Sequence, residues 1–357
     1  MTLDRKTPTI QDVARFANVS TATVSRTLSA PEKVSDGTRA RVSEAIRVTG
    51  YTLNEAGRSL RRRTARTILV ALPDIRNSFF SSILDAIERE AANRGYGVLV
   101  LNLYFGHETV RRLQNFLLSN RADGLLLLDG SVDTETLQAL AGQADSIPIV
   151  VACEEIPNSG FHTVLTDNVE AAERATEHLI DLGHRRIGHL LGPDHNVVSR
   201  DRLAGYSKAL ATAGLSPAPE WQFRGNFDME SGYAAAARFL SMGSRPSAIF
   251  AANDESAIGF LSGLRQHGIT CPRDISVVGF DDLGVATHYV PPLTTMRQPR
   301  EAIGRMAAEA LIDTVEAPEA LMVPLRIILR SELIVRESTA RFREVATMGG
   351  VDGIVTS

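Results

Sequence analysis

The chain has 357 residues, a formal net charge of −4 and 44% hydrophobic residues, a composition typical of a globular protein with room for two or three domains. Its two cysteines form no disulfide framework, and no HxxxH or CxxC spacing indicates a metal site. The residues after Met1 are polar and no stretch approaches the ~20 apolar residues of a membrane span, so we expect a cytoplasmic, nucleoid-associated protein without membrane contact.

Charge is unevenly distributed along the chain. Residues 1–66 hold 13 Lys or Arg against 6 Asp or Glu, whereas the remainder holds 25 basic against 36 acidic residues. A basic N-terminal segment on an acidic body is typical of a nucleic-acid-binding protein whose body stays off the polyanion. The alternative is a solvated run of charges with no binding role.

Two short helices joined by a turn are predicted near the N-terminus. Residues 9–17 start on a threonine that can cap a helix, and they repeat apolar side chains at helical spacing. After the turn, Ser20 can cap a second helix whose buried stripe contains Val24 and Leu28. A helix-turn-helix of this kind places its second helix in a DNA major groove. Four side chains of that helix are left to face outward: Thr21, Ala22, Ser25 and Arg26.

A third helix and a basic segment complete this region. Residues 38–49 carry an apolar stripe, with Ser35 as the cap and Gly50 as the stop. In residues 54–62, Leu60 stands among arginines, and such a segment cannot bury enough surface to be a stable helix alone. We expect it to fold only against DNA.

The run TIQDVARFANVSTATVSRTLSAPEKVSDGTRARVSEAIRVTGY, residues 9–51, resembles the DNA-binding head of the LacI family of bacterial transcriptional repressors. The resemblance implies that residues 54–62 form a hinge helix and that Leu60 is wedged into the minor groove at the operator centre. A core leucine is the alternative for Leu60, and Arg26 has two alternative roles, at a guanine edge or at a phosphate. The resemblance implies DNA contacts for Thr9, Ser20, Thr21, Ala22, Thr23, Ser25, Arg26, Asn54, Arg58 and Leu60.

Three residues depart from the family pattern. Asn18 replaces a glycine in the turn, and asparagine tolerates a positive φ better than other non-glycine residues. Leu53 replaces a common proline, and Gly57 replaces a common alanine at a cost to the helix of roughly 1 kcal/mol. We therefore predict a hinge that is unfolded in the free protein.

Short apolar runs alternate with amphipathic helices from residue 67 onward. Strands in which every residue is apolar indicate parallel sheets covered by helices on both faces. The predicted strands are too many for one small sheet, so we expect two sheets. We expect strands at 68–72, 98–101, 124–128, 148–152, 187–191, 248–252 and 275–280, and a strand-rich segment at 323–335. We expect helices up to Gly95 and at 108–119, 133–142, 169–182, 201–213, 230–242, 255–267 and 300–316.

This region also resembles the LacI family, in stretches such as LGHRRIGHLLGP, IFAANDESAIG and PPLTTMRQP, and so is similar to the type I periplasmic-binding-protein fold. The fold class is therefore an all-α helix-turn-helix head on an α/β body of two doubly wound lobes. The expected domains are the head at 1–52, the hinge at 53–65, an effector-binding and dimerisation domain at 66–340, and a tail at 341–357. Lobe 1 is expected at 66–165 and 296–326, lobe 2 at 167–293 and 329–340, with crossings near 165–167, 293–296 and 325–329. The tail lacks a heptad repeat, so a homodimer is expected.

Ligands of such folds lie beyond the carboxyl ends of the strands, which for two lobes means the cleft between them. Residues placed just after strands are therefore candidates, and the family's effector-lining positions include Phe79, Phe80, Arg202, Phe227 and Asp281. The full set of predicted effector contacts is Phe79, Phe80, Cys153, Asn196, Arg202, Phe227, Asn253 and Asp281. Asn77, Glu154 and Val198 also follow strands.

Several of these positions have structural alternatives. Phe80 can be a core residue, Asp254 a helix cap and Asp282 a surface turn, while His184 is interpreted as structural. Asp194 and His195 could form an acid–base pair. Without a nucleophile or a metal, however, we expect neither catalytic residues nor a cofactor.

The predicted function is a sequence-specific transcriptional regulator, interpreted as a repressor, that binds a palindromic operator in double-stranded DNA under the control of a small-molecule effector. Similarity to the cytidine-repressor branch favours a nucleoside, with a sugar or polyol second, although Cys153 and Asn196 depart from the sugar-binding and purine-binding patterns. The alternatives are a sugar-binding protein for a transporter and, less favoured, an enzyme acting on sugars or nucleosides.

Overall fold

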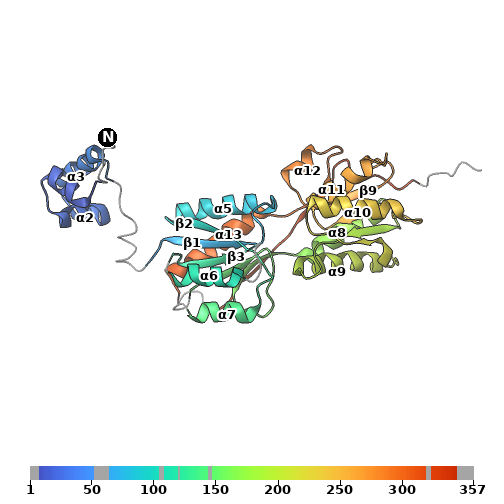
Figure 1. Cartoon of the computed structure of the whole chain (residues 1–357), viewed down its shortest axis with the longest axis horizontal. Helices are drawn as coiled ribbons and strands as arrows, with labels where there is room; N and C mark the ends of the chain where they lie inside the picture. The colour runs from blue at the N-terminus through green and yellow to red at the C-terminus, as the bar shows by residue number, and fades with distance from the viewer. Residues whose placement is uncertain are drawn as a thin grey trace, which may run out of the picture. The chain divides into compact units, whose positions relative to one another are not determined.

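The computed structural model describes residues 8–51, 64–103, 108–119, 121–143, 147–318 and 323–343. The chain divides into two compact units, Met1–Arg63 and Thr64–Ser357 (Figure 1). Within the described residues, no helix is long and apolar enough to cross a membrane. The predicted hinge residues 54–62 lie outside the described residues.

The first unit is a small helical domain with one core. Its helices are α1 (Ile10–Ala17), α2 (Thr21–Ser29), the 3-10 turn η1 (Pro31–Lys33) and α3 (Asp36–Thr49). The predicted apolar stripes meet in its centre, which confirms the helix-turn-helix arrangement. The buried members are Val13, Ala14, Ala17, Val24, Val42 and Ala45.

Local backbone chemistry sets the ends of these helices. Asn18 ends α1 in the left-handed region with φ 51°, so asparagine does occupy the conformation that a glycine would adopt there. Ser20 caps α2, because its hydroxyl accepts a hydrogen bond from the backbone N–H of Thr23 at 3.1 Å. Gly50 ends α3 with φ 66°, as the sequence predicts.

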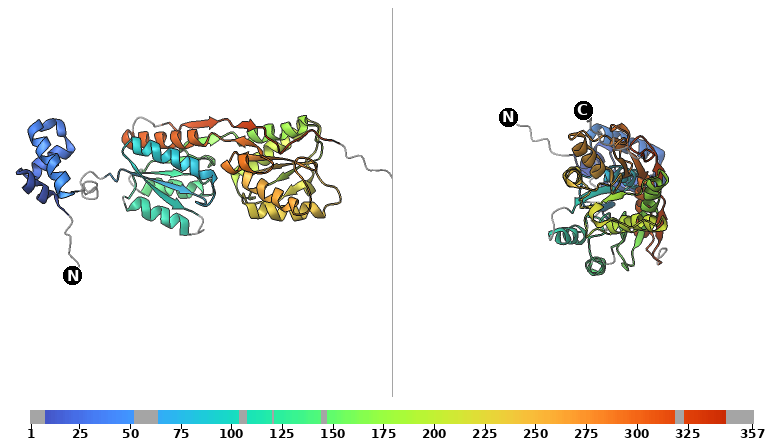
Figure 2. Two further views of the ribbon diagram at one scale, coloured as in Figure 1. Left: turned by 90° about the horizontal axis from the view of Figure 1, so that it is seen from above. Right: turned by 90° about the vertical axis from the view of Figure 1, so that its right-hand side faces the viewer.

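The second unit has two lobes, each built on a six-stranded sheet (Figure 2). The first sheet is parallel throughout and has the order β11-β5-β4-β3-β1-β2. Its strands are β1 (Thr67–Leu72), β2 (Gly97–Asn102), β3 (Gly124–Leu127), β4 (Ile149–Ala152), β5 (His162–Thr166) and β11 (Arg326–Leu329). Its helices are α5 (Phe79–Asn93), α6 (Glu108–Leu118), α7 (Thr134–Gln143) and α13 (Arg300–Glu316).

The second sheet has the order β12-β10-β9-β8-β6-β7, with only β12 antiparallel to its neighbour. Its strands are β6 (Ile187–Leu190), β7 (Gln222–Phe223), β8 (Ala248–Ala251), β9 (Ser276–Asp281), β10 (Thr294–Arg297) and β12 (Glu332–Ile334). Its helices are α8 (Asn168–Asp181), α9 (Val197–Thr212), α10 (Met229–Ser241), α11 (Asp254–Arg265) and α12 (Gly284–His288), and the 3-10 turn η2 spans Pro219–Trp221.

Both faces of each sheet are covered, which explains why the strands are apolar at every position. On β1, Ile68 and Val70 pack with α5 and α13, whereas Leu69 and Ala71 pack with α6 and α7 on the other face. In the second lobe α10 and α11 cover one face, and α8 and α9 cover the other. The predicted α/β class and the two doubly wound lobes are therefore confirmed.

The crossings between the lobes differ in part from the predicted positions. The chain passes to the second lobe between Thr166 and Asn168, within the range expected. It returns only after Arg297, which is later than the predicted range 293–296, because residues 294–297 form β10 and pair with β9 of the second sheet. The last crossing follows Leu329, because β11 runs along β5 to that residue.

Candidate functional site

The outward face of α2 is polar and exposed. Thr21, Ala22, Ser25 and Arg26 are all exposed, while Val24 and Thr27 on the opposite side are buried. Ser20 and Thr23 hydrogen-bond to each other at the first turn, with their hydroxyl oxygens 2.9 Å apart. Short side chains next to a helix N-terminus allow the backbone to approach a nucleic acid closely, and the free N–H groups favour a phosphate.

Arg26 differs from three other arginines of this domain, which pair with acidic residues. Arg15 pairs with Asp12 at 3.3 Å, Arg47 pairs with Glu44 at 2.6 Å, and Arg39 pairs with Asp36. The side chain of Arg26 makes no hydrogen bond or ion pair with any residue in the described part of the chain. Its guanidinium group is therefore available for a partner outside the chain, and a base edge and a phosphate both suit it.

The remaining predicted DNA contacts have different positions. Thr9 is exposed, but its backbone N–H and its hydroxyl both donate to the carboxylate of Asp12, at 2.9 and 2.7 Å, so its side chain has a structural role at the start of α1. Asn54, Arg58 and Leu60 lie outside the described residues.

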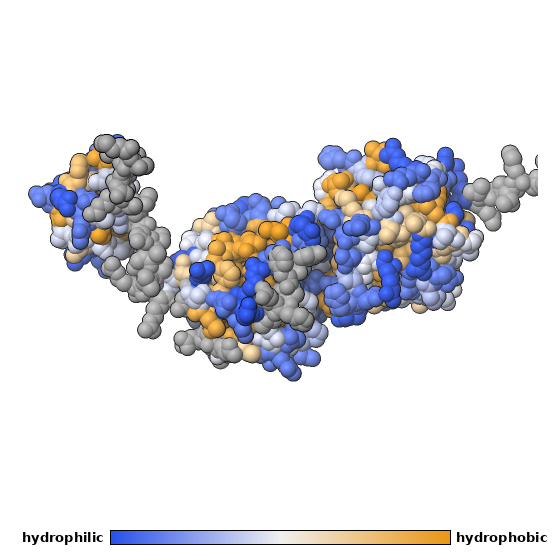
Figure 3. Space-filling model, viewed as in Figure 1, coloured by the Kyte–Doolittle hydropathy of each residue, from blue (hydrophilic) through white to orange (hydrophobic). Residues whose placement is uncertain are grey.

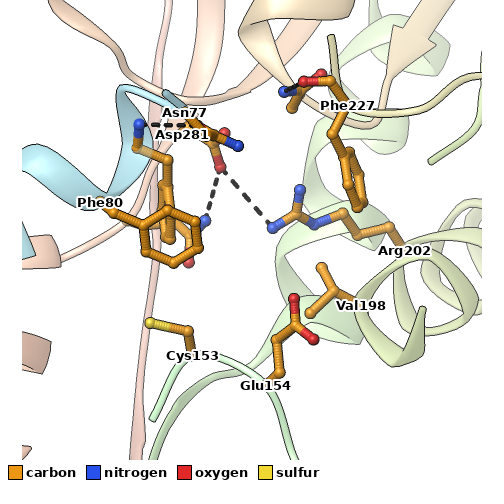
Figure 4. Close-up of a pocket in the computed structure, with 11 residues that line it drawn as sticks. Asn77, Phe80, Cys153, Glu154, Val198, Arg202, Phe227 and Asp281 are labelled. Atoms are coloured by element: carbon orange, nitrogen blue, oxygen red, sulfur yellow. Dashed lines mark hydrogen bonds and ion pairs between the residues drawn. The ribbon is translucent and has the colours of Figure 1, made fainter. Parts of the chain in front are cut away.

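A second site is the pocket between the two lobes, a cavity of about 60 Å³ (Figure 4). Seven of the eight predicted effector contacts line it. The lining residues are Asn77, Phe79, Phe80, Cys153, Glu154, Val198, Arg202, Phe227, Asn253, Asp281 and Gln298. Most of them follow the carboxyl end of a strand, which is where a doubly wound fold binds its ligands.

Arg202 is the buried cation of the pocket. Its side chain donates to the side-chain oxygen of Asn168 at 3.0 Å and to the backbone oxygen of Ala252. The guanidinium lies 3.7 Å from the ring centre of Phe280. Burial lowers the pKa of Arg202 to about 10, so the group remains charged at neutral pH. These contacts fix its direction before any ligand arrives.

Asp281 is the matching anion. One of its carboxylate oxygens lies 3.8 Å from Arg202 and accepts a hydrogen bond from the amide of Gln298 at 2.7 Å. Burial raises the pKa of Asp281 to about 6, and the nearby Arg202 opposes that rise. The separation from Arg202 is longer than a direct hydrogen bond, so both groups keep capacity to bind a ligand hydroxyl.

Glu154 adds a second carboxyl group, which Figure 4 shows pointing toward the Arg202 side of the pocket. Its two oxygens accept from the backbone N–H of Gly130 and from the amide of Asn196, each at 2.9 Å. Burial, and then the negative charge of Asp129, raise the pKa of Glu154 to about 7. This carboxyl group can therefore act as a hydrogen-bond donor or acceptor near neutral pH.

Aromatic rings form the apolar walls. The rings of Phe79 and Phe80 meet edge to face with centres 5.1 Å apart, and Phe80 belongs both to the lobe 1 core and to the pocket wall. Phe227 lies on the Arg202 side. A side chain at Gly192 would collide with the ring of Phe227, so this glycine is required for the position of the ring.

The backbone is strained at three pocket residues. Cys153, Phe227 and Asp281 are non-glycine residues with positive φ values of 69°, 59° and 111°. Each such conformation costs of the order of 1–3 kcal/mol and is retained mainly at functional sites. The strain therefore supports a binding role for this cavity independently of the chemistry of its side chains.

Asn196 is the predicted contact that the structure does not bring to the pocket wall. Its side-chain oxygen caps α9 by accepting from the N–H of Ser199 at 3.2 Å, and its amide holds Glu154. The helix predicted at 201–213 therefore begins at Val197, where this cap places it. Gln298 was missed, because it follows a strand, β10, that the sequence did not predict.

Other proposed roles are resolved by hydrogen bonding. Asn253, not Asp254, caps α11, accepting from the N–H of Ser256 at 3.1 Å. Asp254 is fully buried and accepts from the hydroxyl of Thr295 at 2.6 Å and from the N–H of Leu283 at 2.8 Å. Asp282 is no simple surface turn, because Arg297 and Arg336 each donate to it at 2.6 Å.

The candidate acid–base residues have other partners in the part of the chain that the structure describes. His184 is structural, since its ring nitrogens contact the hydroxyls of Ser247 and Ser276 at 2.9 and 3.1 Å. Asp194 pairs weakly with Arg224 at 3.9 Å rather than with His195. Among the described residues, no group of three His, Cys, Asp or Glu could hold a metal ion.

Comparison with known proteins gives two family matches. Residues 9–54 match the model of bacterial regulatory proteins of the lacI family, and residues 176–339 match a periplasmic binding protein-like domain. The HTH-type transcriptional repressor CytR of Escherichia coli K12 is 38% identical over 331 residues, which cover 93% of this chain and 96% of the relative. The HTH-type transcriptional repressor PurR of Photobacterium profundum is 36% identical over 309 residues, 86% of this chain and 92% of the relative.

Solved structures share the whole architecture. A lac repressor dimer bound to operator and the anti-inducer ONPF superposes with a TM-score of 0.85 at 28% identity, covering 94% of this chain and all of that one. The transcriptional regulator CelR in complex with cellobiose gives a TM-score of 0.70 at 32% identity, covering 93% of this chain and 99% of that one.

Proposed function

The chain belongs to the lacI family of bacterial regulatory proteins and is a DNA-binding transcriptional repressor with an effector-binding body, and from this premise we propose that a homodimer binds a near-palindromic operator through α2. The observation that carries the proposal is the exposed polar face of α2, where the side chain of Arg26, unlike those of Arg15, Arg39 and Arg47, has no acidic partner among the described residues. The family is one of repressors, not of enzymes.

In this proposal Thr21 and Ala22 select the bases that are read. Both side chains are short, so they discriminate by close contact rather than by long reach, as a threonine or alanine does against a thymine methyl group. Arg26 adds a bidentate contact to a guanine or a phosphate. Leu60 of the hinge is proposed to enter the central minor groove between the two half-sites.

Dimer formation is supported by an apolar surface on the first lobe. Strand β2 is at the edge of its sheet, and Leu99 and Val100 on it are 36% and 43% exposed. Figure 3 shows a hydrophobic area over this strand. Contiguous exposed apolar surface of this kind marks an interaction site, and a two-fold copy of the same surface is its simplest partner.

The effector is proposed to be a nucleoside. Phe80 and Phe227 offer ring faces for a base, and Arg202 with Asp281 offers charge-assisted hydrogen bonds to ribose hydroxyls. Glu154 lies within the same cavity and can pair with an exocyclic amino group of the base. A sugar without a base would leave the aromatic walls without a stacking partner, so it is the second candidate.

Control is proposed to act through the arrangement of the lobes. An effector that contacts residues from both lobes stabilises one interlobe arrangement over others. The first lobes meet at the dimer surface, so their movement changes the separation of the two hinges and with it the hinge's equilibrium between coil and helix. The repressor acts in the cytoplasm, where operator DNA and nucleosides are both present.

Two experiments test the proposal. Selection of binding sequences from a random DNA pool by the full chain should yield near-palindromes, and Arg26→Ala should relax the preference at one symmetric pair of positions. Selection of sequences without two-fold symmetry would contradict the homodimer. A thermal-shift screen of the full chain against nucleosides and sugars should give its largest stabilisation with a nucleoside, and stabilisation by sugars alone would contradict the assignment of the effector.

A further inference from the structure

A second cavity lies next to the effector pocket. Its volume is about 210 Å³, against about 60 Å³ for the pocket, and Cys153 and Val198 line both. The other walls come from β5 and β11 of the first lobe and from the starts of α8 and α9 of the second. A ligand here would therefore contact both lobes without occupying the effector pocket.

The charged lining of this cavity is predominantly negative. Glu155, Asp167 and Asp201 line it together with a single cation, Arg326. Arg326 pairs with both carboxylate oxygens of Glu155 at 3.1 Å, and Asp167 is engaged as the cap of α8, accepting from the N–H of Glu170 at 2.9 Å. Among the three acidic residues of the lining, only Asp201 is then not engaged by Arg326 or by a helix N-terminus.

The side chain of Asp201 makes no hydrogen bond or ion pair with any described residue, although the charges of Arg200 and Arg202 partly oppose the effect of its burial. Burial, followed by repulsion from Glu155, raises its pKa. Burial of a carboxylate without a direct partner is unfavourable, and a cation placed against it would reduce that cost.

A second polar group in the wall also lacks a partner. Thr166 is only 5% exposed, and its hydroxyl has no hydrogen-bond partner in the described structure. Buried hydroxyls are nearly always paired, so a rotation about χ1 that turns this enclosed hydroxyl toward a ligand in the cavity would give it a partner. The other lining includes the aliphatic side chains of Leu165, Val169, Val198 and Ile328.

We propose that this cavity is a second small-molecule site that binds an organic ammonium ion with a short aliphatic body. The ammonium group would donate to Asp201, a polar group at the other end would pair with Thr166, and the aliphatic part would lie along Val198 and Ile328. A metal ion suits the cavity less well, because no described group of three acidic, histidine or cysteine residues could hold one. The proposal goes beyond the effector and does not depend on its identity.

The test is isothermal titration of the full chain with 1,4-diaminobutane at constant ionic strength, with butane-1,4-diol as the neutral analogue. We expect saturable binding of one diamine per chain and none of the diol. Asp201→Asn should weaken binding roughly tenfold to a hundredfold, the effect of one hydrogen bond to a charged group. Asp181→Asn is the matched control, because Asp181 is an exposed aspartate at the far end of α8 and its replacement changes net charge equally.

A second variant distinguishes a loss of diamine binding from a loss of folding. Thr166→Val keeps the shape of the side chain and removes no hydrogen bond, so it should weaken diamine binding while leaving thermal stability unchanged. Absence of saturable binding, or equal weakening by Asp201→Asn and Asp181→Asn, would overturn the proposal, since the latter is the signature of non-specific charge attraction. Operator affinity without diamine should be the same in all three variants, so failure here is distinguishable from failure of the proposed function.

Discussion

Replacing Glu154 by glutamine should make the protein more stable at alkaline pH. Burial raises the pKa of Glu154 from 4.5 to about 7, so the folded state binds its proton more tightly than the unfolded state does. The contribution of Glu154 to the stability of the folded protein is therefore fully present below pH 4.5 and is lost as the pH rises through about 7. At 1.36 kcal/mol per pKa unit, the loss from this residue reaches about 3 kcal/mol above pH 8.

Glutamine removes this titration but cannot replace both hydrogen bonds. The carboxylate accepts from Gly130 and from Asn196, whereas a glutamine side chain has one accepting oxygen and one donating amide. Loss of one hydrogen bond costs about 1 kcal/mol at every pH. Glu154→Gln should therefore match the native protein near pH 5 and exceed its stability by about 2 kcal/mol near pH 8.5, from the same linkage.

The assay is urea unfolding of the full chain, followed by circular dichroism at the two pH values. Glu177→Gln, at an exposed position of α8, is the matched control. Its difference in unfolding free energy from the native protein should be the same at both pH values. A stability difference between Glu154→Gln and the native protein that stays constant from pH 5 to pH 8.5 would refute the burial of a titrating carboxyl group in this pocket.

Three further predictions concern the DNA-binding head and the hinge. Ser20→Ala removes the cap of α2 and should cost about 1 kcal/mol of unfolding free energy by chemical denaturation, with a parallel loss of operator affinity. Asn18→Val forces a β-branched residue into the left-handed region and should lower the melting temperature of the head, whereas Asn18→Gly should not; equal melting temperatures would contradict the turn geometry. Leu60→Ala should weaken operator binding and bending in gel-shift assays while most salt-sensitive non-specific binding remains; equal losses in both would rule out the wedge.

Much of the head could be predicted from its sequence because each end of each helix is encoded locally. Ser20, Asn18 and Gly50 act within a turn of their own position, and the apolar stripe containing Val13 and Val24 follows directly from helical spacing. No distant contact was needed to identify these features, so the expected fold and the observed one agree there.

Strands of mixed polarity were missed for the opposite reason. β5 and β10 contain His162, Thr163, Thr294 and Thr295, which a pattern of continuous apolar residues excludes. These side chains are buried nonetheless, because distant groups bind them: His162 accepts from the N–H of Leu325 at 2.9 Å, and the hydroxyl of Thr295 donates to Asp254. Such pairings are not visible in a local sequence window.

In the candidate effector site, too, some residues could be predicted from local sequence and others could not. Position after a strand was enough to indicate Phe79, Cys153, Asn253 and Asp281. Position after a strand could not show that Asn196 lies outside the pocket wall. The place of its side chain depends on the cap of α9 and on the position of Glu154.

The most direct test of the account is the affinity of the full chain for its selected operator, measured by fluorescence anisotropy as ribonucleosides are added. We expect one nucleoside to change the operator Kd by about fivefold or more, the usual range of allosteric coupling. Asp281→Asn should abolish that response and leave the affinity without nucleoside unchanged, because asparagine tolerates the left-handed backbone at this position. An operator affinity that no nucleoside alters, or a full response in Asp281→Asn, would contradict control of DNA binding through this pocket.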